Sequence, residues 1–231
     1  MSIILILLSM AAGIGLPMVL IIKNKTVFNV KDCFSGVLFY LIFRVLCYPM
    51  IANAIGGSSL LIKLFTDFAY LVFITVVCKK IYITKVLKAD KTAVGKTVSF
   101  TIGETLSEVL LANMPNLINL GAYFFMINFG NINESLQGYS QLEIDRIVST
   151  YTSIPVEYYL FLFISIIALV IFNLYNNTML VKNYRFSVAL TVIFYLVYVC
   201  ISAVNKWIAI LLMISIIGAI YYASRNEKVN K

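Results

Sequence analysis

The stretch VSFTIGETLSEVLLANMPNLINLGAYFFMINFG, residues Val98–Gly130, decides how this chain folds. It is mostly apolar, but it is interrupted by Glu104, Glu108, Asn113, Pro115, Asn116 and Asn119. At about 1.5 Å per residue, the stretch is too long for one simple membrane span and barely long enough for two. Because proline removes a backbone hydrogen bond, Pro115 predicts a break or kink near the middle of the helix.

Similar apolar runs lie on both sides of this stretch. The chain has 231 residues, of which 61% are hydrophobic and 12% are charged, far below the roughly 25% charged residues of a soluble domain. The composition predicts one all-α domain over residues 1–231, a bundle of transmembrane helices. The other predicted spans are about Ile3–Ile22, Cys33–Ile55, Leu60–Cys78, Val156–Tyr175, Phe186–Val204 and Trp207–Ala223.

The charges of two connections predict the orientation in the membrane. Residues 79–97 carry six lysines against Asp90 alone, whereas residues 131–155 are polar and carry Glu134, Glu143 and Asp145 against Arg146. The positive-inside rule places the basic loop 79–97 in the cytoplasm. If 98–130 crosses once, there are seven spans, the loop 131–155 and the N-terminus are outside, and the C-terminus is cytoplasmic. If it crosses twice, there are eight spans and both loops lie on one side. We favour a single broken crossing, with a re-entrant half as a variant of it.

The net charge of +8 does not indicate a nucleic-acid partner, because the basic residues lie at the ends of apolar runs. The bilayer itself is the expected partner of such a surface. The first run begins MSIILILL, with no basic residue and no AxA-like cleavage site before Lys23. It therefore predicts a retained transmembrane helix and not a removed signal peptide.

Glu104 and Glu108 are the leading candidates for chemistry, since their i, i+4 spacing puts them on one helix face. One interpretation is a pair of carboxylates that share a proton and act as an acid/base couple, a proton relay or a cation site. The other is structural: each carboxylate neutralises Arg44 or Lys63, or extends toward the membrane surface. We favour the structural interpretation.

Arg44 is the most enclosed cation in the predicted spans. Arginine stays protonated in proteins, so Arg44 needs a carboxylate, backbone carbonyls or lipid headgroups as partners. Asp67, Glu104 and Glu108 are the candidate acids. Lys63 and Asp67 are also spaced i, i+4, which predicts an ion pair within one helix.

Three asparagines, Asn113, Asn116 and Asn119, surround Pro115 at helical spacing. Amides in a span bond to neighbouring helices and to backbone groups that a proline leaves free, so packing is the favoured interpretation and a substrate path the alternative. The candidate polar intramembrane site is thus Glu104, Glu108, Arg44, Asp67 and Asn113.

The chain contains no histidine, and its four cysteines are scattered without a CxxC pair. It has no HExxH, no GxxxxGK[ST] and no GxSxG motif. We therefore expect no metal site, no cofactor and no histidine-based catalytic triad.

The run TIGETLSEVLLANMPNLINL resembles the central GIGHGGIEAILL-like motif of the YhfC-type intramembrane metalloproteases of Gram-positive bacteria. Gly103 and Glu108 match the glycine and glutamate of that motif, while Glu104 stands where the family has histidine. In SIPVEYY, Glu157 matches a later GGIER-like turn, but Tyr158 replaces its arginine. SGVLFYLIFRVL is similar to the family's second span.

The chain departs from this family at the residues that would hold the metal. The EExxR-like motif is missing around TDFAYLVFITVVCKK, and no histidine stands near Ser165 or Phe194. The resemblance implies a protease-like scaffold in a bacterial plasma membrane that has lost its metal site. It would bind a membrane peptide or protein partner without cutting it, in bacteriocin immunity, regulation or export.

Two alternatives remain open. The chain is a small permease with a carboxylate-lined path for a cation or substrate, or it retains acid/base activity through Glu104 and Glu108 on a lipid-linked substrate. The second is disfavoured, because the sequence offers no nucleophile with an activating partner.

Overall fold

The computed structural model describes residues 2–89, 94–130 and 132–229, and these residues are mostly helical. Within them, seven segments are long and apolar enough to cross a membrane. In chain order, spans 1 to 7 are Ser2–Lys23, Val30–Ala54, Leu60–Val86, Gly95–Asn128, Val156–Lys182, Tyr184–Val204 and Lys206–Arg225. The prediction of an all-α bundle of seven spans is confirmed.

Several spans change from α-helical to π-helical and back. Span 2 is made of α2 (Val30–Tyr40), the π-helical η1 (Leu41–Cys47) and α3 (Tyr48–Ala54). Span 3 is made of α4 (Leu60–Phe73), η2 (Ile74–Cys78), α5 (Lys79–Ile81) and η3 (Tyr82–Val86). Span 4 is made of α6 (Val94–Glu108), η4 (Val109–Asn113) and α7 (Met114–Asn128). Span 6 is made of α11 (Tyr184–Tyr195), η5 (Leu196–Ile201) and α12 (Ser202–Val204). Spans 1, 5 and 7 are the continuous helices α1 (Ser2–Lys23), α10 (Val156–Lys182) and α13 (Lys206–Val229).

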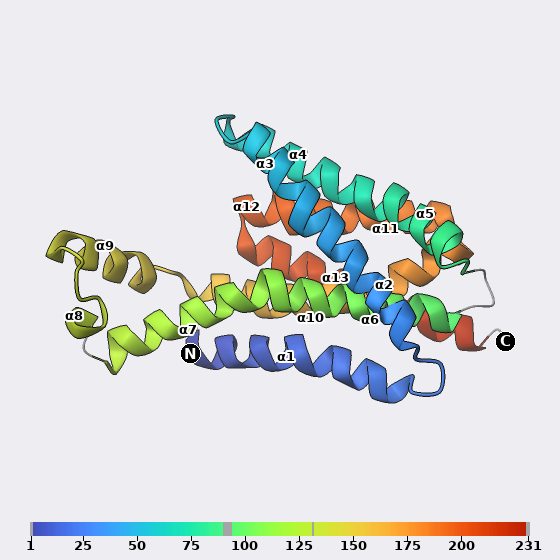
Figure 1. The fold of residues 1–231 in the computed structure, drawn as a ribbon, viewed down its shortest axis with the longest axis horizontal. Coiled ribbons are helices and arrows are strands. Elements are labelled where there is room, and N and C mark those ends of the chain that lie inside the picture. Colours follow the sequence, from blue (N-terminus) through green and yellow to red (C-terminus); the bar gives the residue numbers. More distant parts are fainter. Residues whose placement is uncertain (1, 90–93, 131, 230–231) are drawn as a thin grey trace.

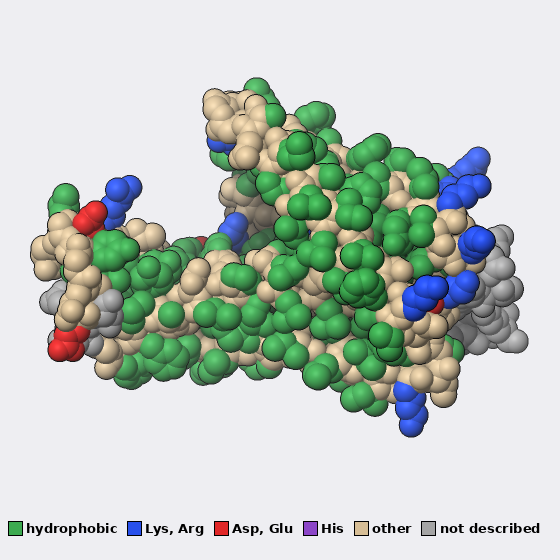
Figure 2. All heavy atoms as spheres, in the orientation of Figure 1, with side chains coloured by type: hydrophobic (Ala, Val, Ile, Leu, Met, Phe, Trp, Pro, Cys, Tyr) green, Lys and Arg blue, Asp and Glu red, His purple; other side chains and the backbone are tan. Residues whose placement is uncertain are grey.

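The two ends of the bundle differ in charge (Figures 1 and 2). One end, called here the basic end, carries Lys23, Lys25, Lys80, Lys85, Lys88, Lys96, Lys182 and Arg185. The other end, called here the α9 end, holds the Gly56–Ser59 turn and the short helices α8 (Ile132–Ser135) and α9 (Gln141–Thr152). Figure 2 shows Lys and Arg side chains on the basic end, and both acidic and basic side chains on the projecting α8–α9 segment, where Glu134, Glu143 and Asp145 outnumber Arg146.

Span 5 is the centre of the bundle. Half of its most apolar stretch is buried, the largest share among the seven spans, and α10 packs against α1, α6, α11 and α13. Phe172 of α10 stacks on Phe194 of α11 with ring centroids 4.0 Å apart, and both rings are fully buried. Burial of such large aromatic side chains is a main source of packing energy.

Spans 2 and 4 touch through glycine at the basic end and separate toward the α9 end. A methyl group added at Gly36 would overlap the carbonyl oxygen of Phe100, and one added at Gly103 would overlap the carbonyl oxygen of Cys33. Small residues allow membrane helices to approach this closely. Farther along, α3 and α7 diverge in Figure 1.

Span 4 is one helix without a re-entrant half, and the predicted interruption takes the form of the π-helical turn η4. Pro115 follows this turn in the first turn of α7. Proline is tolerated there because a π turn already departs from the regular α-helical hydrogen-bonding pattern that a proline would interrupt. Span 4 has 34 residues, about 51 Å of helix, so it exceeds the roughly 30 Å hydrocarbon core and carries α8 and α9 beyond it.

The connection between spans 3 and 4 is shorter than the predicted loop 79–97. The helix continues to Val86, and span 4 already begins before Lys96. Lysine side chains can be kept at a helix end because their long stems reach favourable partners. Here Lys80 lies over the ring of Tyr184, 3.2 Å from its centroid. The expected acid of this loop, Asp90, is outside the described residues.

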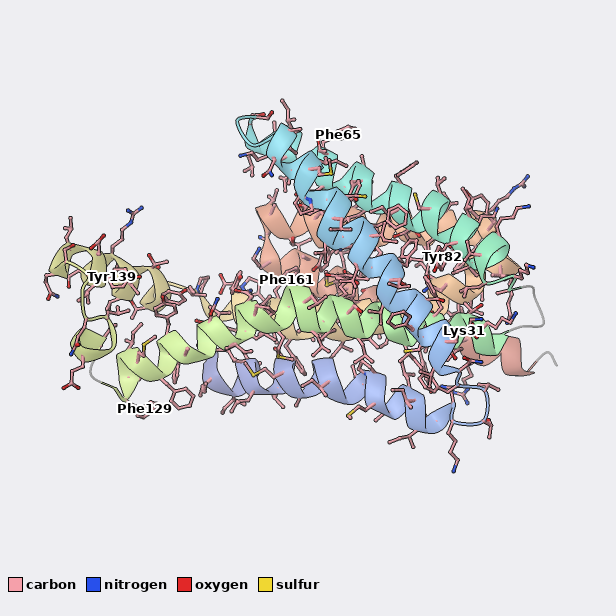
Figure 3. All side chains as sticks on the ribbon, viewed as in Figure 1. Lys31, Phe65, Tyr82, Phe129, Tyr139 and Phe161 are labelled. Carbon is pink, nitrogen blue, oxygen red and sulfur yellow. The ribbon has the colours of Figure 1, made fainter. Side chains whose placement is uncertain are left out.

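The outside of the bundle is apolar, as a lipid-facing surface must be. Phe65 and Phe129 are 69% and 76% exposed. In Figure 3 both lie at the outside, with Tyr139 on the α8–α9 segment, whereas Phe161 lies between helices. Figure 2 shows hydrophobic side chains over most of the visible helical flank.

Candidate functional site

The two glutamates of α6 each form an ion pair inside the bundle. Glu104 Oε1 is 2.8 Å from Lys79 Nζ of span 3, and Glu108 Oε1 is 2.8 Å from Arg44 Nη2 of span 2. Lys79 is 1% exposed and each glutamate is 6% exposed. Because each carboxylate faces its own cation, the charges are compensated pair by pair, and the two glutamates do not depend on a shared proton.

Span 5 supplies amides to both ion pairs. Asn177 Nδ2 donates to Glu104 Oε2 at 3.1 Å and to Thr101 Oγ1 at 2.9 Å. Asn173 Nδ2 donates to Glu108 Oε2 at 3.4 Å. These residues, with Lys79 and Arg44, form what we call the polar core, which joins spans 2, 3, 4 and 5. Buried charges are stable in a membrane protein only when they have partners of this kind.

Three buried oxygens, two of them in the polar core and one on α6, lack a hydrogen-bond partner among the described residues. They are Oδ1 of Asn173, Oδ1 of Asn177 and Oγ1 of Thr105. All three residues are at most 1% exposed. Buried acceptors without donors are uncommon in proteins, and the ones here line the carboxylates of α6. They could accept hydrogen bonds or a cation.

A second set of amide and hydroxyl groups joins spans 5 and 6. Asn176 Nδ2 donates to Thr191 Oγ1 at 3.0 Å, and Ser187 Oγ donates to Asn176 Oδ1 at 2.7 Å. Asn176, Ser187 and Thr191 are completely buried. Every side-chain group of this set has a partner, so it fixes the position of α10 against α11.

The π-helical turns lie next to the ionisable residues. Arg44 is inside η1, Lys79 directly follows η2, Glu108 directly precedes η4, and Tyr198 is inside η5. Such turns are rare and are frequent at functional sites, because the extra residue leaves carbonyl groups free and changes which way side chains point. Asn113 Nδ2 donates to the carbonyl oxygen of Glu108 at 3.3 Å, at the start of η4.

A cavity of about 270 Å³ adjoins the Arg44–Glu108 pair, and we call it the Arg44 cavity. Its lining combines two opposite charges, three tyrosines and small or branched apolar residues: Tyr40, Arg44, Tyr48, Asp67, Leu71, Ala112, Tyr198 and Val199. Asp67 Oδ1 accepts a hydrogen bond of 2.8 Å from Tyr48 Oη. The lining residues of the cavity come from spans 2, 3, 4 and 6.

The structure brings together only part of the predicted site. Of the three candidate acids, Glu108 is the partner of Arg44. Asp67 bonds to Tyr48 and does not form the predicted pair with Lys63, because Tyr48 of span 2 reaches it across the helix interface. Asp67 lines the Arg44 cavity, whereas the Asn113 side chain donates a hydrogen bond to the backbone carbonyl of Glu108.

The basic partner of Glu104 and the amides of span 5 were not predicted from the sequence. Lys79 was expected in a loop, but it is the most deeply buried cation among the described residues. Asn173, Asn176 and Asn177 carry a signal that could have revealed them: their i, i+3 and i+4 spacing puts three amides on one face of an apolar helix. Two of them lie beyond the predicted end of span 5 at Tyr175, which concealed the pattern.

Near the places where the resemblance expects histidines, Ser165 and Phe194 make packing and backbone contacts. Ser165 Oγ donates to the carbonyl oxygen of Leu162 at 2.9 Å, and Phe194 stacks on Phe172. Within the described residues, no group of three or more acidic or cysteine side chains could hold a metal ion. The donor set of the polar core, carboxylates already paired with ammonium and guanidinium groups, does not suit zinc.

Comparison of the chain with protein-family models, curated proteins and solved structures gives no match, so its function is inferred from the polar core and the Arg44 cavity.

Proposed function

We propose that this chain is a membrane-embedded binding protein that holds a membrane-inserted peptide or protein partner at the Arg44 cavity without cleaving it. The observation that carries the proposal is the lining of this cavity. A guanidinium group, a carboxylate and tyrosine hydroxyls surround about 270 Å³ within the spans. Such a lining is unsuited to a hydrocarbon chain and suited to polar groups that enter the membrane.

A peptide in the hydrocarbon region must satisfy each of its polar groups internally or with a protein partner. A polar side chain or a helix end that projects from such a peptide would find partners in Arg44, Asp67 and Tyr48. The volume suits a side chain or a short segment, since drug-sized ligands occupy cavities of about 300–1,000 Å³. We therefore expect recognition of one projecting group, with helix–helix contacts around it.

The polar core supports a non-catalytic role. General acid/base catalysis needs a carboxylate that is free to exchange a proton with substrate, whereas Glu104 and Glu108 face Lys79 and Arg44. Ser165 and Phe194 stand where the resemblance expects metal ligands. A protease-like scaffold that has lost catalysis and kept peptide binding is consistent with immunity, regulation of a protease or accessory export.

We propose an orientation with the basic end in the cytoplasm and the N-terminus and residues 131–155 outside a bacterial plasma membrane. The charge difference between the two ends supports it. A single cysteine introduced at 137 would be labelled by an impermeant maleimide in intact cells. Labelling only after permeabilisation would refute this orientation.

Site-specific photo-crosslinking in the native cells tests the binding proposal. Benzoylphenylalanine at Val199 or Ala112 lies in the cavity wall, whereas the same residue at Leu211 of span 7 faces lipid. We expect one discrete peptide or protein adduct from the two cavity positions, absent at Leu211 and lost when Asp67→Asn is added. Only lipid adducts at all three positions would refute the proposal.

A cation or proton permease is the second candidate, favoured by the unpartnered oxygens of Asn173 and Asn177 beside the carboxylates. Buried acceptors next to acids are typical of ion paths in membranes. In proteoliposomes with an internal pH dye, a permease would carry protons, and the Glu104→Gln/Glu108→Gln double variant would abolish the flux. Absence of proton flux with the unaltered protein would contradict the proton-permease candidate and leave the binding role as the favoured one.

A further inference from the structure

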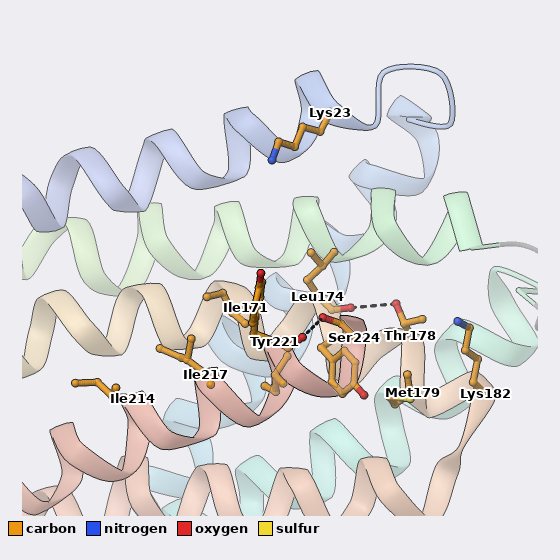
Figure 4. Close-up of a pocket in the computed structure, with 13 residues that line it drawn as sticks. Lys23, Ile171, Leu174, Thr178, Met179, Lys182, Ile214, Ile217, Tyr221 and Ser224 are labelled. Carbon is orange, nitrogen blue, oxygen red and sulfur yellow. Dashed lines mark hydrogen bonds between the residues drawn. The ribbon is translucent and has the colours of Figure 1, made fainter. Parts of the chain in front are cut away.

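A second and larger pocket lies on the other side of the molecule, where α1 and α13 flank α10, and we call it the α1–α13 groove. Its volume is about 980 Å³. Its apolar surface comes from residues such as Ile171 and Leu174 of α10 and Ile217 of α13, and Lys23 and Lys182 are the two charged residues that line it. In Figure 4, Lys182 lies at one end of the pocket and Ile214 at the other.

The dimensions of the groove match one leaflet of a bilayer. Along α13 the lining extends from Ile214 to Ser224, which lie ten residues or about 15 Å apart. This is half of the roughly 30 Å hydrocarbon core. Lys182 and Ser224 mark the end of the groove that belongs to the basic end of the bundle.

The charges of the groove lie where lipid headgroups begin. Lys23 is in the last turn of α1 and Lys182 in the last turn of α10, so both lie where these spans leave the hydrocarbon core. Basic residues at this depth between transmembrane helices attract anionic headgroups. We propose that the α1–α13 groove binds an anionic phospholipid, with one acyl chain along Ile171, Leu174 and Ile217 and the phosphate beside Lys23 and Lys182.

Gly218 provides a way to test the acyl-chain part of the site. A methyl group added to Gly218 would meet no atom within 4 Å, so the space above this residue is open. A leucine there would project into the groove without displacing the backbone. Gly15 of α1 has equally open surroundings and does not line the groove, which makes Gly15→Leu the matched control.

Native mass spectrometry of the purified chain, released from detergent, can count bound lipids. The probes are dioleoylphosphatidylglycerol, which is anionic, and dioleoylphosphatidylcholine, which has the same chains and no net charge. We expect one tightly bound phosphatidylglycerol and a preference of about ten- to thirtyfold over phosphatidylcholine, from two lysines near the membrane surface. Lys23→Gln/Lys182→Gln should reduce this preference to less than threefold.

Gly218→Leu should reduce the affinity of this site for both lipids by at least tenfold, whereas Gly15→Leu should bind both lipids as the unaltered protein does. Equal binding by the two glycine variants, or no preference in the unaltered protein, would overturn the proposal. If Gly218→Leu does not fold, the unaltered protein still tests the proposal. Its preference for phosphatidylglycerol over phosphatidylcholine must fall as the salt concentration is raised. Spans 1, 5 and 7 form this groove, so the result is independent of the Arg44 cavity and of the proposed binding role.

Discussion

Arg44 Nη2, inside η1 of span 2, is 2.8 Å from Glu108 Oε1, which directly precedes η4 of span 4. The same two spans also touch through Gly36 and Gly103 and through the rings of Phe39 and Phe100, so the ion pair adds a polar connection to an apolar contact. It also forms the edge of the Arg44 cavity. The pair therefore links the stability of the bundle to the shape of its proposed binding site.

Reversal of the charge of Arg44 should prevent accumulation of the protein. In Arg44→Glu, two carboxylates face each other, and removal of one partner from a buried pair already costs about 3–5 kcal/mol. The Arg44→Glu/Glu108→Arg double variant should recover part of the accumulation. Immunoblots of isolated membranes measure this, with Lys31→Glu, an exposed position of span 2, as control. Normal levels of Arg44→Glu would contradict the pairing.

The Lys79–Glu104 pair should behave as one unit in a double-mutant cycle. Lys79→Met alone leaves the Glu104 carboxylate with the amide of Asn177 as its hydrogen-bond donor and without a cation, and should destabilise the protein by roughly 3 kcal/mol or more. Lys79→Met/Glu104→Gln should be clearly more stable than Lys79→Met, because no charge remains buried. Thermal unfolding in detergent measures both variants, and strictly additive effects would show that the two residues are not coupled.

The close contact of spans 2 and 4 requires glycine. Gly36→Ala and Gly103→Ala should each cost about 1–3 kcal/mol, because the added methyl group overlaps a backbone carbonyl that cannot move alone. For a chain of this size that corresponds to a decrease in Tm of roughly 3–10 °C. Gly15→Ala is the control, since its surroundings are open. A Tm of Gly36→Ala or Gly103→Ala equal to that of the control would refute the contact.

Helix α9 should lose protection at acidic pH. The Ser140 hydroxyl and backbone N–H donate to the carboxylate of Glu143, which lowers the pKa of Glu143 below its usual value of 4.5. Because the folded pKa is the lower one, the capping contribution is complete above pH 4.5 and is lost as pH falls through the folded pKa. Hydrogen exchange of the first amides of α9, corrected for the intrinsic pH dependence, measures this loss.

The matched variant Glu143→Gln keeps a side chain of the same shape but does not titrate in this range. Its exchange in the first turn of α9 should be independent of pH after the same correction. An equal acid-induced loss in this variant would mean that another group causes the change.

The number and order of the spans were predictable because each span is a long apolar run, and the thickness of the bilayer fixes the length that a run needs. Hydropathy could not locate where span 3 ends, since Lys79 and Lys80 resemble a loop in sequence. Their partners, Glu104 and the ring of Tyr184, come from distant spans. A buried lysine and a cytoplasmic lysine look identical until the partner is known.

Of the residues in the candidate site, only some of the ionisable ones could be predicted from the sequence. Arg44, Glu104 and Glu108 are conspicuous because charge is rare in a span. Asn173, Asn177 and Tyr48 are not conspicuous, since amides and tyrosines occur in many membrane helices for packing alone. The π turn before Pro115 could not be predicted from the sequence either. A proline predicts that a helix is irregular, but it does not predict which irregularity forms.

The polar core has a consequence for biogenesis, because its partners are synthesised at different times. Arg44 is made 64 residues before Glu108, and Lys79 also precedes its partner Glu104. While span 4 is still being synthesised, Arg44 and Lys79 are without the glutamates that pair with them in the folded protein. We therefore expect span 4 to stabilise spans 2 and 3 in the membrane. Chains that stop before Glu104 should be removed by membrane quality control, however hydrophobic their first three helices are.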